Sequence, residues 1–441
     1  MSLHQINLLP KDDNTNGWAA GLPPRTPRPA LQGDIRADWV VVGAGYAGLA
    51  AARRLAENRP SEKVVLIEAG AAADGAAGRN SGFAIDLPHA VGITGDENAK
   101  ARAYMRLARA AIRQLKDLID HHGIDCGWNE KGKYQAAVTE AGVDTFLKPF
   151  AQALDRLDEP YEWIDFDALR ARVGMTHFKR AIFTPGGALL NPVALVRGLA
   201  DTLPENVELY EHTPALSVEY ANGVRLTTPE GSIFAPKMVL GVNSFAADFD
   251  VLRNKIIPVV AHATLSRPLT AEEQAAYGVE EAWGLTPGNS LVGITMRYTH
   301  DKRLLIRELI DYNPKRRVSD GDRRALTIRH KKLFDQRYPM LKHVEMAHTW
   351  SGHLALTRNG APGFGEVRPG VFMACAQNAI GITKGTISGH LVADMACGVD
   401  NPLIADMAGL GVPTDLPTQP FLGWGVRTRL SWERFRWRSE A

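Results

Sequence analysis

The sequence predicts an α/β protein built on a parallel sheet, and three observations near the N-terminus predict it. An apolar run at 37–42 (ADWVVV) leads directly into the glycine-rich turn GAGYAG at 43–48. The Ala-rich segment 46–58 has the spacing of a close-packed helix, and a second apolar run at 62–68 (EKVVLIE) ends on an acidic residue. A strand, a glycine turn, a helix and another strand form a βαβ unit, which implies a parallel sheet.

The glycine turn satisfies the pattern G-x-G-x-x-G in the context that gives this pattern a meaning. Gly43 makes the tight turn, Gly45 lets a pyrophosphate approach the backbone, and Gly48 lets the helix pack closely on the strand. The helix N-terminus offers unpaired N–H groups and a positive dipole to phosphates. Glu68 lies twenty residues beyond Gly48, where a carboxylate accepts ribose hydroxyls and repels a 2′-phosphate. The unit therefore favours NAD or FAD over NADP.

Composition limits the remaining choices. A chain of 441 residues contains roughly two or three units of ~100–200 residues each. The net charge of +2 argues against a nucleic-acid-binding protein. The three cysteines form no CxxC pair, so we expect no metal site and a reducing, cytoplasmic location. No stretch approaches the ~18 apolar residues of a membrane span, and the polar, Pro-rich N-terminus does not resemble a signal peptide.

The rest of the chain alternates between helical and strand-like patterns. Helical periodicity dominates 97–122, whereas 207–243 and 255–307 have the alternation typical of strands. The charge-dense run 313–332 is interpreted as a solvated loop leading into a helix. The segment 371–398 predicts a strand, a glycine turn and a helix, which is a second helix N-terminus available to a ligand.

A second stretch of small residues, GAAGRNSGF at 75–83, distinguishes the possible cofactors. An NAD dehydrogenase does not need such a loop after the second strand, whereas FAD is longer and its ring system must reach deep into the protein. Small residues permit close backbone approach to the pyrophosphate and flavin. Arg79 and Asn80 can donate to phosphate or flavin carbonyl oxygens. An ordinary flexible loop is the alternative interpretation of these residues alone.

Taken with the first turn, this loop resembles the FAD-dependent D-amino-acid oxidase superfamily, closest to its branch with γ-glutamylputrescine oxidase and other bacterial amine or amino-acid oxidoreductases. Further segments resemble that branch in the same order, namely GGALLNP at 186–192, KIIPVVAHATLSRPL at 255–269, TMRYTHDKRLLI at 295–306 and WSGHLALTRNGAPGFG at 350–365. The likeness breaks at QNAIGITKGT, 377–386, where the branch usually reads GYSGHG. Arg267 also stands where the branch has an acid. Substrate and oxygen handling are therefore not carried over from the family.

The resemblance implies a discontinuous, Rossmann-like FAD-binding domain of the glutathione-reductase type and a substrate domain built on an antiparallel sheet. We expect an N-terminal arm at 1–33, an FAD-binding domain from 34–100, 181–250 and 346–405, a substrate domain from 101–180 and 251–345, and a C-terminal tail at 406–441. The basic, aromatic tail either packs on its own domain or forms a helix that contacts a membrane surface.

The resemblance also implies the chemistry. Family members oxidise the C–N bond of a small amine or amino acid by hydride transfer to the flavin, the imine hydrolyses, and oxygen reoxidises the flavin. Only one nucleotide fingerprint is present, which disfavours a pyridine-nucleotide-linked reductase. Two alternatives stay open: an FAD amine dehydrogenase linked to a quinone or a protein, and a flavoprotein subunit without turnover.

Candidate site residues follow from the matching positions. The residues expected to bind FAD are Gly43, Gly45, Tyr46, Ala47, Gly48, Glu68, Ala69, Arg79, Asn80, Ser81, Gly82, Ala215, Asn243, Ser244, Gly352, Gly381, Ile382, Thr383 and Lys384. The candidates for substrate binding and catalysis are Arg297, Tyr298, Lys384 and His353, with His262 and His348 also near the flavin by resemblance. Arg297 can hold a carboxylate through two parallel hydrogen bonds. The alternatives are an ordinary strand residue for Arg297, a solvated Lys384, and structural roles for the histidines.

Overall fold

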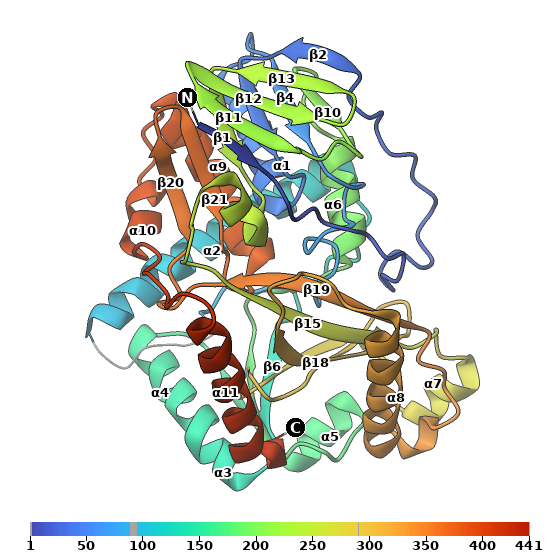
Figure 1. The fold of residues 1–441 in the computed structure, drawn as a ribbon. Helices are drawn as coiled ribbons and strands as arrows, with labels where there is room; N and C mark the ends of the chain where they lie inside the picture. The colour runs from blue at the N-terminus through green and yellow to red at the C-terminus, as the bar shows by residue number, and fades with distance from the viewer. Residues whose placement is uncertain (1, 89–94, 290, 441) are drawn as a thin grey trace.

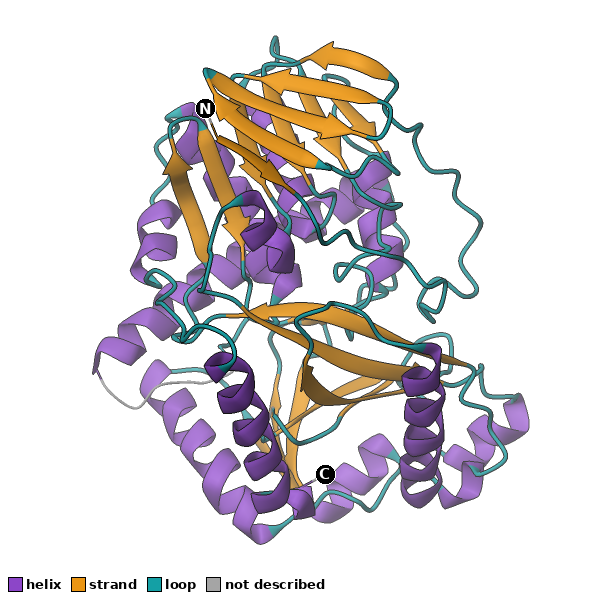
Figure 2. Ribbon diagram, viewed as in Figure 1, coloured by secondary structure: helices purple, strands orange, loops and turns teal. Residues whose placement is uncertain are grey.

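A computed structural model describes residues 2–88, 95–289 and 291–440 (Figure 1). The chain forms two bodies, one around a parallel sheet with a smaller sheet above it, and one around a large, mainly antiparallel sheet (Figure 2). This architecture confirms the predicted α/β fold with a second, antiparallel-sheet domain.

The first body is built on a six-stranded sheet in which only the last strand is antiparallel to its neighbour. In spatial order its strands are β10 (Val207–Tyr210), β4 (Val64–Ile67), β3 (Trp39–Val42), β14 (Lys237–Leu240), β21 (Val371–Cys375) and β20 (Gly363–Arg368). Strands β3 and β4 are buried along their whole length, because helices cover one face of the sheet and the smaller sheet covers the other.

Two helices on this sheet approach each other unusually closely. Helix α1 (Tyr46–Asn58) follows β3, and α9 (Thr386–Cys397) follows β21 and a π-helical turn, η4 (Gly381–Gly385). A Cβ at Gly389 of α9 would lie 2.0 Å from the carbonyl oxygen of Ala47, so only glycine fits at this crossing. The crossing therefore places the starts of α1 and of the η4–α9 segment side by side.

The smaller sheet has five strands in the order β1 (Ser2–Gln5), β11 (Ser217–Ala221), β12 (Gly223–Thr228), β13 (Gly231–Ala235) and β2 (Gly33–Arg36). Its first strand corrects the description of the N-terminus as an arm, because Ser2–Gln5 pairs with β11. The segment between β1 and β2 then runs down to the second body and back (Figure 1).

The second body is built on an eight-stranded sheet that is antiparallel except where β16 pairs with β6. In spatial order its strands are β19 (His348–Leu356), β15 (Ile257–Leu265), β18 (Leu304–Tyr312), β17 (Thr295–Tyr298), β16 (Trp283–Pro287), β6 (Lys133–Ala137), β8 (Arg180–Thr184) and β7 (Glu162–Ile164). The expected domain boundaries put β19 and most of β8 in the FAD-binding domain, whereas both are strands of this sheet.

Helices surround both sheets. Their bounds are α2 (Gly95–His122), α3 (Glu140–Gly142), α4 (Lys148–Leu157), α5 (Phe166–Val173), α6 (Pro192–Asp201), α7 (Ala271–Tyr277), α8 (Asp320–Arg337), α10 (Leu403–Gly409) and α11 (Phe421–Arg436). In addition, β5 (Phe83–Ala84) and β9 (Ala188–Leu189) form a two-stranded antiparallel sheet. The charge-dense run becomes a loop and α8, where Ser319 and Asp322 form a capping box. Within the described residues, no helix is both long and apolar enough to span a membrane.

Candidate functional site

A cavity of about 410 Å³ opens where the parallel strands end at their carboxyl side and faces β19 of the second body. Ligands of open α/β sheets bind at such strand ends. Twelve of the residues expected to bind FAD line the cavity: Gly43, Gly45, Tyr46, Ala47, Glu68, Ala69, Arg79, Asn80, Ala215, Asn243, Ser244 and Gly381. The other expected residues are not part of this lining.

The first glycine turn has the geometry that its sequence predicts. Gly43 has a φ of +97°, a left-handed conformation that favours glycine. A Cβ at Gly48 would lie 1.7 Å from the Gly43 carbonyl oxygen, so α1 packs against the turn itself. Gly45 caps α1 without a side chain, and the first turn contains no acidic residue. The N–H groups at this helix end are therefore open to an anion.

Glu68 closes the turn from the end of β4. Its carboxylate accepts the Ala44 N–H at 2.7 Å and the Gly70 N–H at 3.2 Å. Burial in the cavity wall raises the pKa of Glu68 to about 7, although these N–H groups favour the charged form. Ribose hydroxyls donating to the same oxygens would stabilise that charge further.

Arg79 of the second loop is placed differently from the prediction. Its guanidinium donates to carboxylates of the N-terminal segment, that of Asp13 at 2.8 Å and that of Asp12, and to the carbonyl oxygens of Asp74 and Ser351. These contacts commit the guanidinium to the protein, so Arg79 is not free to act as a phosphate or flavin ligand. It instead ties the loop to the N-terminal segment.

Three side chains from distant segments hold this loop in place. The indole N–H of Trp18 donates to the Asn80 carbonyl at 2.8 Å, and that of Trp350 donates to the Arg79 carbonyl at 3.0 Å. Arg297 donates to the carbonyl oxygens of the next two loop residues at 2.8 and 3.0 Å. Gly352 lets β19 approach the loop, since its Cβ would lie 3.3 Å from the same Arg79 oxygen.

These contacts correct the roles predicted for Arg297 and Tyr298. Arg297 also donates to the Leu190 carbonyl at 2.8 Å, and burial lowers the pKa of its guanidinium to about 9. It lies outside the cavity lining and supports the loop, so it does not hold a substrate carboxylate. Tyr298 is fully buried in the core of the second body, with its ring edge-to-face against Tyr277 at 5.0 Å between centroids.

The last glycine turn, η4, presents its two end residues, Gly381 and Gly385, to the cavity. The three residues between them, Ile382, Thr383 and Lys384, are buried and are not part of the lining. The Thr383 hydroxyl donates to the Ile85 carbonyl at 3.0 Å. Burial lowers the pKa of Lys384 to about 8, and its ammonium lies 6.0 Å from the ring centroid of Tyr104 on α2. Lys384 is therefore neither solvated nor a cavity residue.

Of the three predicted histidines, one lines the cavity. Burial, together with the positive charges of Arg79, Arg316 and Arg317, lowers the pKa of His353 to about 4, so its imidazole is neutral at pH 7. His262 instead contacts the Ser351 hydroxyl at 2.8 Å and the carboxylate of Asp311 at 3.3 Å, which is a structural role. His348 lies outside the lining, against Gly17.

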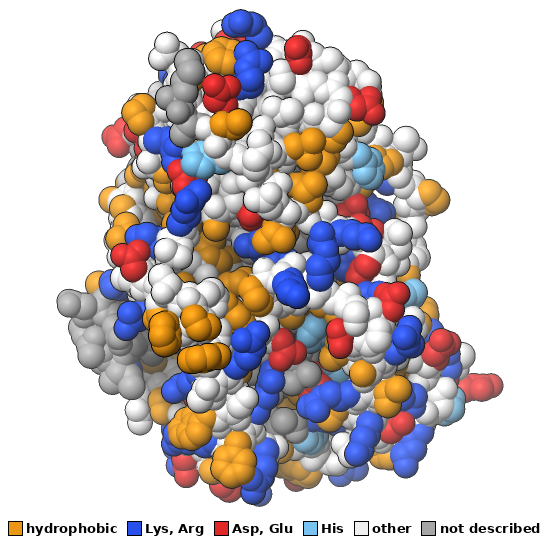
Figure 3. All heavy atoms as spheres, in the orientation of Figure 1, with side chains coloured by type: hydrophobic (Ala, Val, Ile, Leu, Met, Phe, Trp, Pro, Cys, Tyr) orange, Lys and Arg blue, Asp and Glu red, His pale blue; other side chains and the backbone are white. Residues whose placement is uncertain are grey.

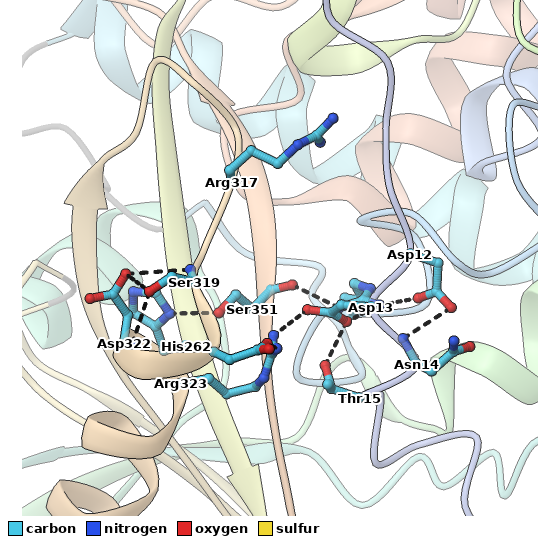
Figure 4. A network of polar contacts seen from close by, with 12 residues as sticks. Asp12, Asp13, Asn14, Thr15, His262, Arg317, Ser319, Asp322, Arg323 and Ser351 are labelled. Atoms are coloured by element: carbon cyan, nitrogen blue, oxygen red, sulfur yellow. Dashed lines mark hydrogen bonds and ion pairs between the residues drawn. The ribbon is translucent and has the colours of Figure 1, made fainter.

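The cavity is also lined by two segments that the sequence did not indicate. One is part of the N-terminal segment, residues 6 and 8–13, and the other is the loop before α8. Asp13 accepts from Arg323 of α8 at 2.6 Å, which joins the two segments across the cavity (Figure 4). Arg317 extends away from this network and donates to the Leu9 and Arg316 carbonyl oxygens. Among the described residues, no carboxylate pairs with it.

The sequence carries only a weak signal for these missed residues. Trp18 is a lone large aromatic residue in a polar, Pro-rich segment, and such a residue is typical of a segment that docks on the protein. Trp350 begins the WSGHLALTRNG segment that resembles the family, but the sequence predicts neither the hydrogen-bond partner of Trp350 nor its role. Arg317 belongs to the charge-dense run 313–332, in which nothing distinguishes it from its neighbours.

Comparison with known proteins identifies the family. The model of the family described as FAD dependent oxidoreductase (DAO) matches residues 38–395. The chain belongs to this family. The oxidoreductase is 25% identical over 422 residues to the gamma-glutamylputrescine oxidoreductase of Escherichia coli, with 92% of each chain covered. It is 27% identical over 400 residues to the probable oxidoreductase OrdL of Rhizobium meliloti, covering 88% of this chain and 89% of the relative.

Solved structures show the same fold. The glycine oxidase of Geobacillus kaustophilus superposes with a TM-score of 0.69 at 22% identity, covering 83% of this chain and 96% of the other. The L-amino acid deaminase of Proteus vulgaris superposes with a TM-score of 0.66 at 17% identity, covering 88% and 99%. FAD is therefore the cofactor of the oxidoreductase, and the bare α1 N-terminus and the left-handed Gly43 fit it.

Proposed function

We propose that this oxidoreductase oxidises the carbon–nitrogen bond of a small amine or amino acid and passes the electrons on to oxygen. The observation that carries the proposal is a cavity that begins at the glycine turn and reaches a neutral His353 on the second body. The names of the relatives agree with it, since they include a gamma-glutamylputrescine oxidoreductase, a glycine oxidase and an L-amino acid deaminase.

FAD, when bound, supplies the acceptor for a hydride from the carbon next to nitrogen. The protein's task is then to bind the amine in its neutral form and to exclude water. The guanidinium groups that lower the pKa of His353 also disfavour a second positive charge beside it, which favours a neutral amine. His353 lines the cavity, and its Nδ1 has no hydrogen-bond partner among the described residues, which leaves the neutral imidazole available to accept a hydrogen bond from an amine N–H.

Arg317 defines the substrate class further. It is exposed at the cavity rim, and its positive charge contributes to the lowered pKa of His353. We propose that it pairs with a carboxylate of the substrate in place of Arg297. The variant Arg317→Gln should raise KM for carboxylate-bearing amines about tenfold to a hundredfold, because charge-assisted hydrogen bonds contribute about 1.5–3 kcal/mol. KM for amines without a carboxylate should not change, and Lys315→Gln, an exposed neighbour outside the lining, is the control.

The test of the reaction itself is anaerobic reduction of the bound flavin. Polyamines, amino acids and N-methyl amines are mixed separately with the holoprotein, and the visible absorbance of the flavin is followed. At least one amine should bleach it rapidly, and air should restore the colour with release of peroxide. If dithionite bleaches the flavin but no amine does so, amine oxidation is not the function.

A second candidate differs only in the electron acceptor. Helix α11 has exposed aromatic side chains, Trp424 and Trp432 among them, and these favour a dehydrogenase that delivers electrons to a membrane quinone. Stoichiometry separates the two candidates: an oxidase forms one peroxide for each amine consumed. Turnover that requires a soluble quinone analogue and forms no peroxide would instead identify the dehydrogenase.

A further inference from the structure

The C-terminal helix α11 carries a row of exposed aromatic side chains. Phe421, Trp424, Trp432 and Phe435 are 63%, 62%, 46% and 69% exposed, and no other stretch of the described chain exposes so many large aromatic residues together. Relative to the first residue they stand at i+3, i+11 and i+14, which 3.6 residues per turn brings onto one side of the helix. The row therefore runs the length of the helix on a single face.

Packing fixes which way this row points. The opposite side of α11 is buried through Gly423, Leu430 and Glu433. Arg434 anchors it to β18, donating to the Ile310 carbonyl at 2.9 Å and to the carboxylate of Asp311 at 2.8 Å. The docked side faces the protein, so the aromatic row is turned outward. In Figure 3, orange side chains gather along this part of the surface, with blue Lys and Arg side chains beside them.

Cations flank the aromatic row on both sides. On the helix, Arg427 lies to one side of the row, and Arg429 and Arg436 lie to the other. The guanidinium groups of Arg429 and Arg436 lie 5.7 and 4.9 Å from the ring centroid of Trp432, and that of Arg438 lies 5.1 Å from the ring of Phe435. The helix contains one carboxylate, Glu433, which is buried and paired with Arg429.

We propose that α11 docks the protein on the surface of an anionic lipid bilayer. Trp and Phe prefer the interface between headgroups and acyl chains, and flanking arginines pair with lipid phosphates. The absence of a spanning helix among the described residues makes the contact peripheral. A second copy of the chain suits the surface less well, because an isologous contact would bring the arginines of both copies together. This inference goes beyond the proposed function and does not depend on the substrate.

The first test is co-sedimentation of the holoprotein with vesicles of phosphatidylcholine alone or mixed equally with phosphatidylglycerol. The wild type should sediment with the mixed vesicles, and less so at high salt. The double variant Trp424→Ser, Trp432→Ser should lower the partition coefficient at least about tenfold, because it removes both indole anchors. Charge reversal through Arg427→Glu and Arg436→Glu should lower it at least about twentyfold, since each arginine near the surface contributes a factor of about five.

A matched control distinguishes docking through α11 from nonspecific binding of any exposed aromatic residue to the vesicles. Trp163 and Phe166 are exposed aromatic residues outside α11, each 37% exposed, and the double variant Trp163→Ser, Phe166→Ser should sediment like the wild type. Every variant must keep its flavin content and melting temperature. Brominated phosphatidylglycerol should quench tryptophan fluorescence in the wild type and less in Trp424→Phe, Trp432→Phe.

Three results would overturn the proposal. The wild type could remain in the supernatant with mixed vesicles, or the control pair could lose binding as strongly as the helix pair. Light scattering could instead show a dimer that the Trp424→Ser, Trp432→Ser change dissolves and that does not bind vesicles. That outcome would assign the aromatic row to a second copy of the chain.

Discussion

FAD binding should depend on pH through Glu68. In the free protein burial raises the pKa of Glu68 from 4.5 to about 7, whereas ribose hydroxyls in the complex donate to its carboxylate and keep it charged. Binding below pH 7 must therefore release a proton. The dissociation constant for FAD should be about tenfold higher at pH 6 than at pH 8 and flat above pH 8. The variant Glu68→Gln should bind about tenfold to a hundredfold more weakly, without this slope.

The same shift predicts how the stability of the free protein changes with pH. The folded state binds the proton of Glu68 more tightly than the unfolded chain, so stability is fully present below pH 4.5 and is lost as the pH rises to about 7. At 1.36 kcal/mol per pH unit the full loss is about 3 kcal/mol. Because Glu68 is partly accessible from the cavity, roughly half of that is expected.

The assay is calorimetric titration of the apoprotein with FAD at pH 6 and 8, in two buffers of different ionisation enthalpy. Close to one proton should be released per FAD at pH 6 and almost none at pH 8. Asp38→Asn, a carboxylate remote from the cavity lining, should behave like the wild type. An unchanged proton count in Glu68→Gln, or equal affinity of the wild type at both pH values, would refute the reasoning.

Three further predictions test the frame around the cofactor. Gly48→Ala puts a Cβ 1.7 Å from a backbone carbonyl oxygen, so the apparent affinity for FAD should fall at least about a hundredfold. Gly425→Ala, whose added Cβ would have nothing within 4 Å, should keep its flavin. In a denaturant titration, Asp13→Ala should lower the free energy of unfolding by about 2 kcal/mol. Asp320 pairs with the same Arg323 but is exposed, so Asp320→Ala should lower it by less than about 1 kcal/mol. The Asp13 effect should be fully present above about pH 4 and should be lost as the pH falls further, through the lowered pKa of Asp13 in the folded protein. Arg297→Met removes the donor for three carbonyl oxygens and should lower the free energy of unfolding by about 3 kcal/mol, so that FAD is released at a lower temperature on heating. It should raise KM no more for amines that carry a carboxylate than for other amines. A larger KM increase for the carboxylate-bearing amines would restore the predicted role of Arg297 in substrate binding.

The parts of the site that could be predicted are those whose causes are local. Gly43, Gly48 and Glu68 act within one βαβ unit of about thirty residues, and each role follows from backbone geometry or from the end of a strand. Gly381 follows in the same way from a strand, a glycine turn and a helix. The antiparallel sheet followed from resemblance rather than from pattern, and the expected boundaries placed two of its strands, β8 and the edge strand β19, with the FAD-binding domain.

Arg79 and Arg297 show why the rest could not be predicted. An arginine beside a glycine-rich loop is typical of a ligand for phosphate or carboxylate, and sequence alone does not show what else competes for it. Here the partners are Asp12 and Asp13, more than sixty residues before Arg79, and a loop over two hundred residues before Arg297. Arginine at a buried position needs such partners, because an unpaired charge there is costly.

Figure 4 shows contacts around Asp13, His262 and Ser351, which belong to a network that joins the loop at 75–83 to distant segments and continues to the C-terminal helix. Ser351 accepts from Arg79 through its carbonyl, and its hydroxyl contacts His262, which contacts Asp311, the anchor of Arg434 on α11. The hydrogen bond from His262 and the charge of Arg434 hold the pKa of Asp311 at about 2, so the chain of contacts stays intact at every physiological pH. These contacts connect the cavity wall to α11, so a bilayer bound to α11 would also set the orientation of the cavity relative to the membrane surface.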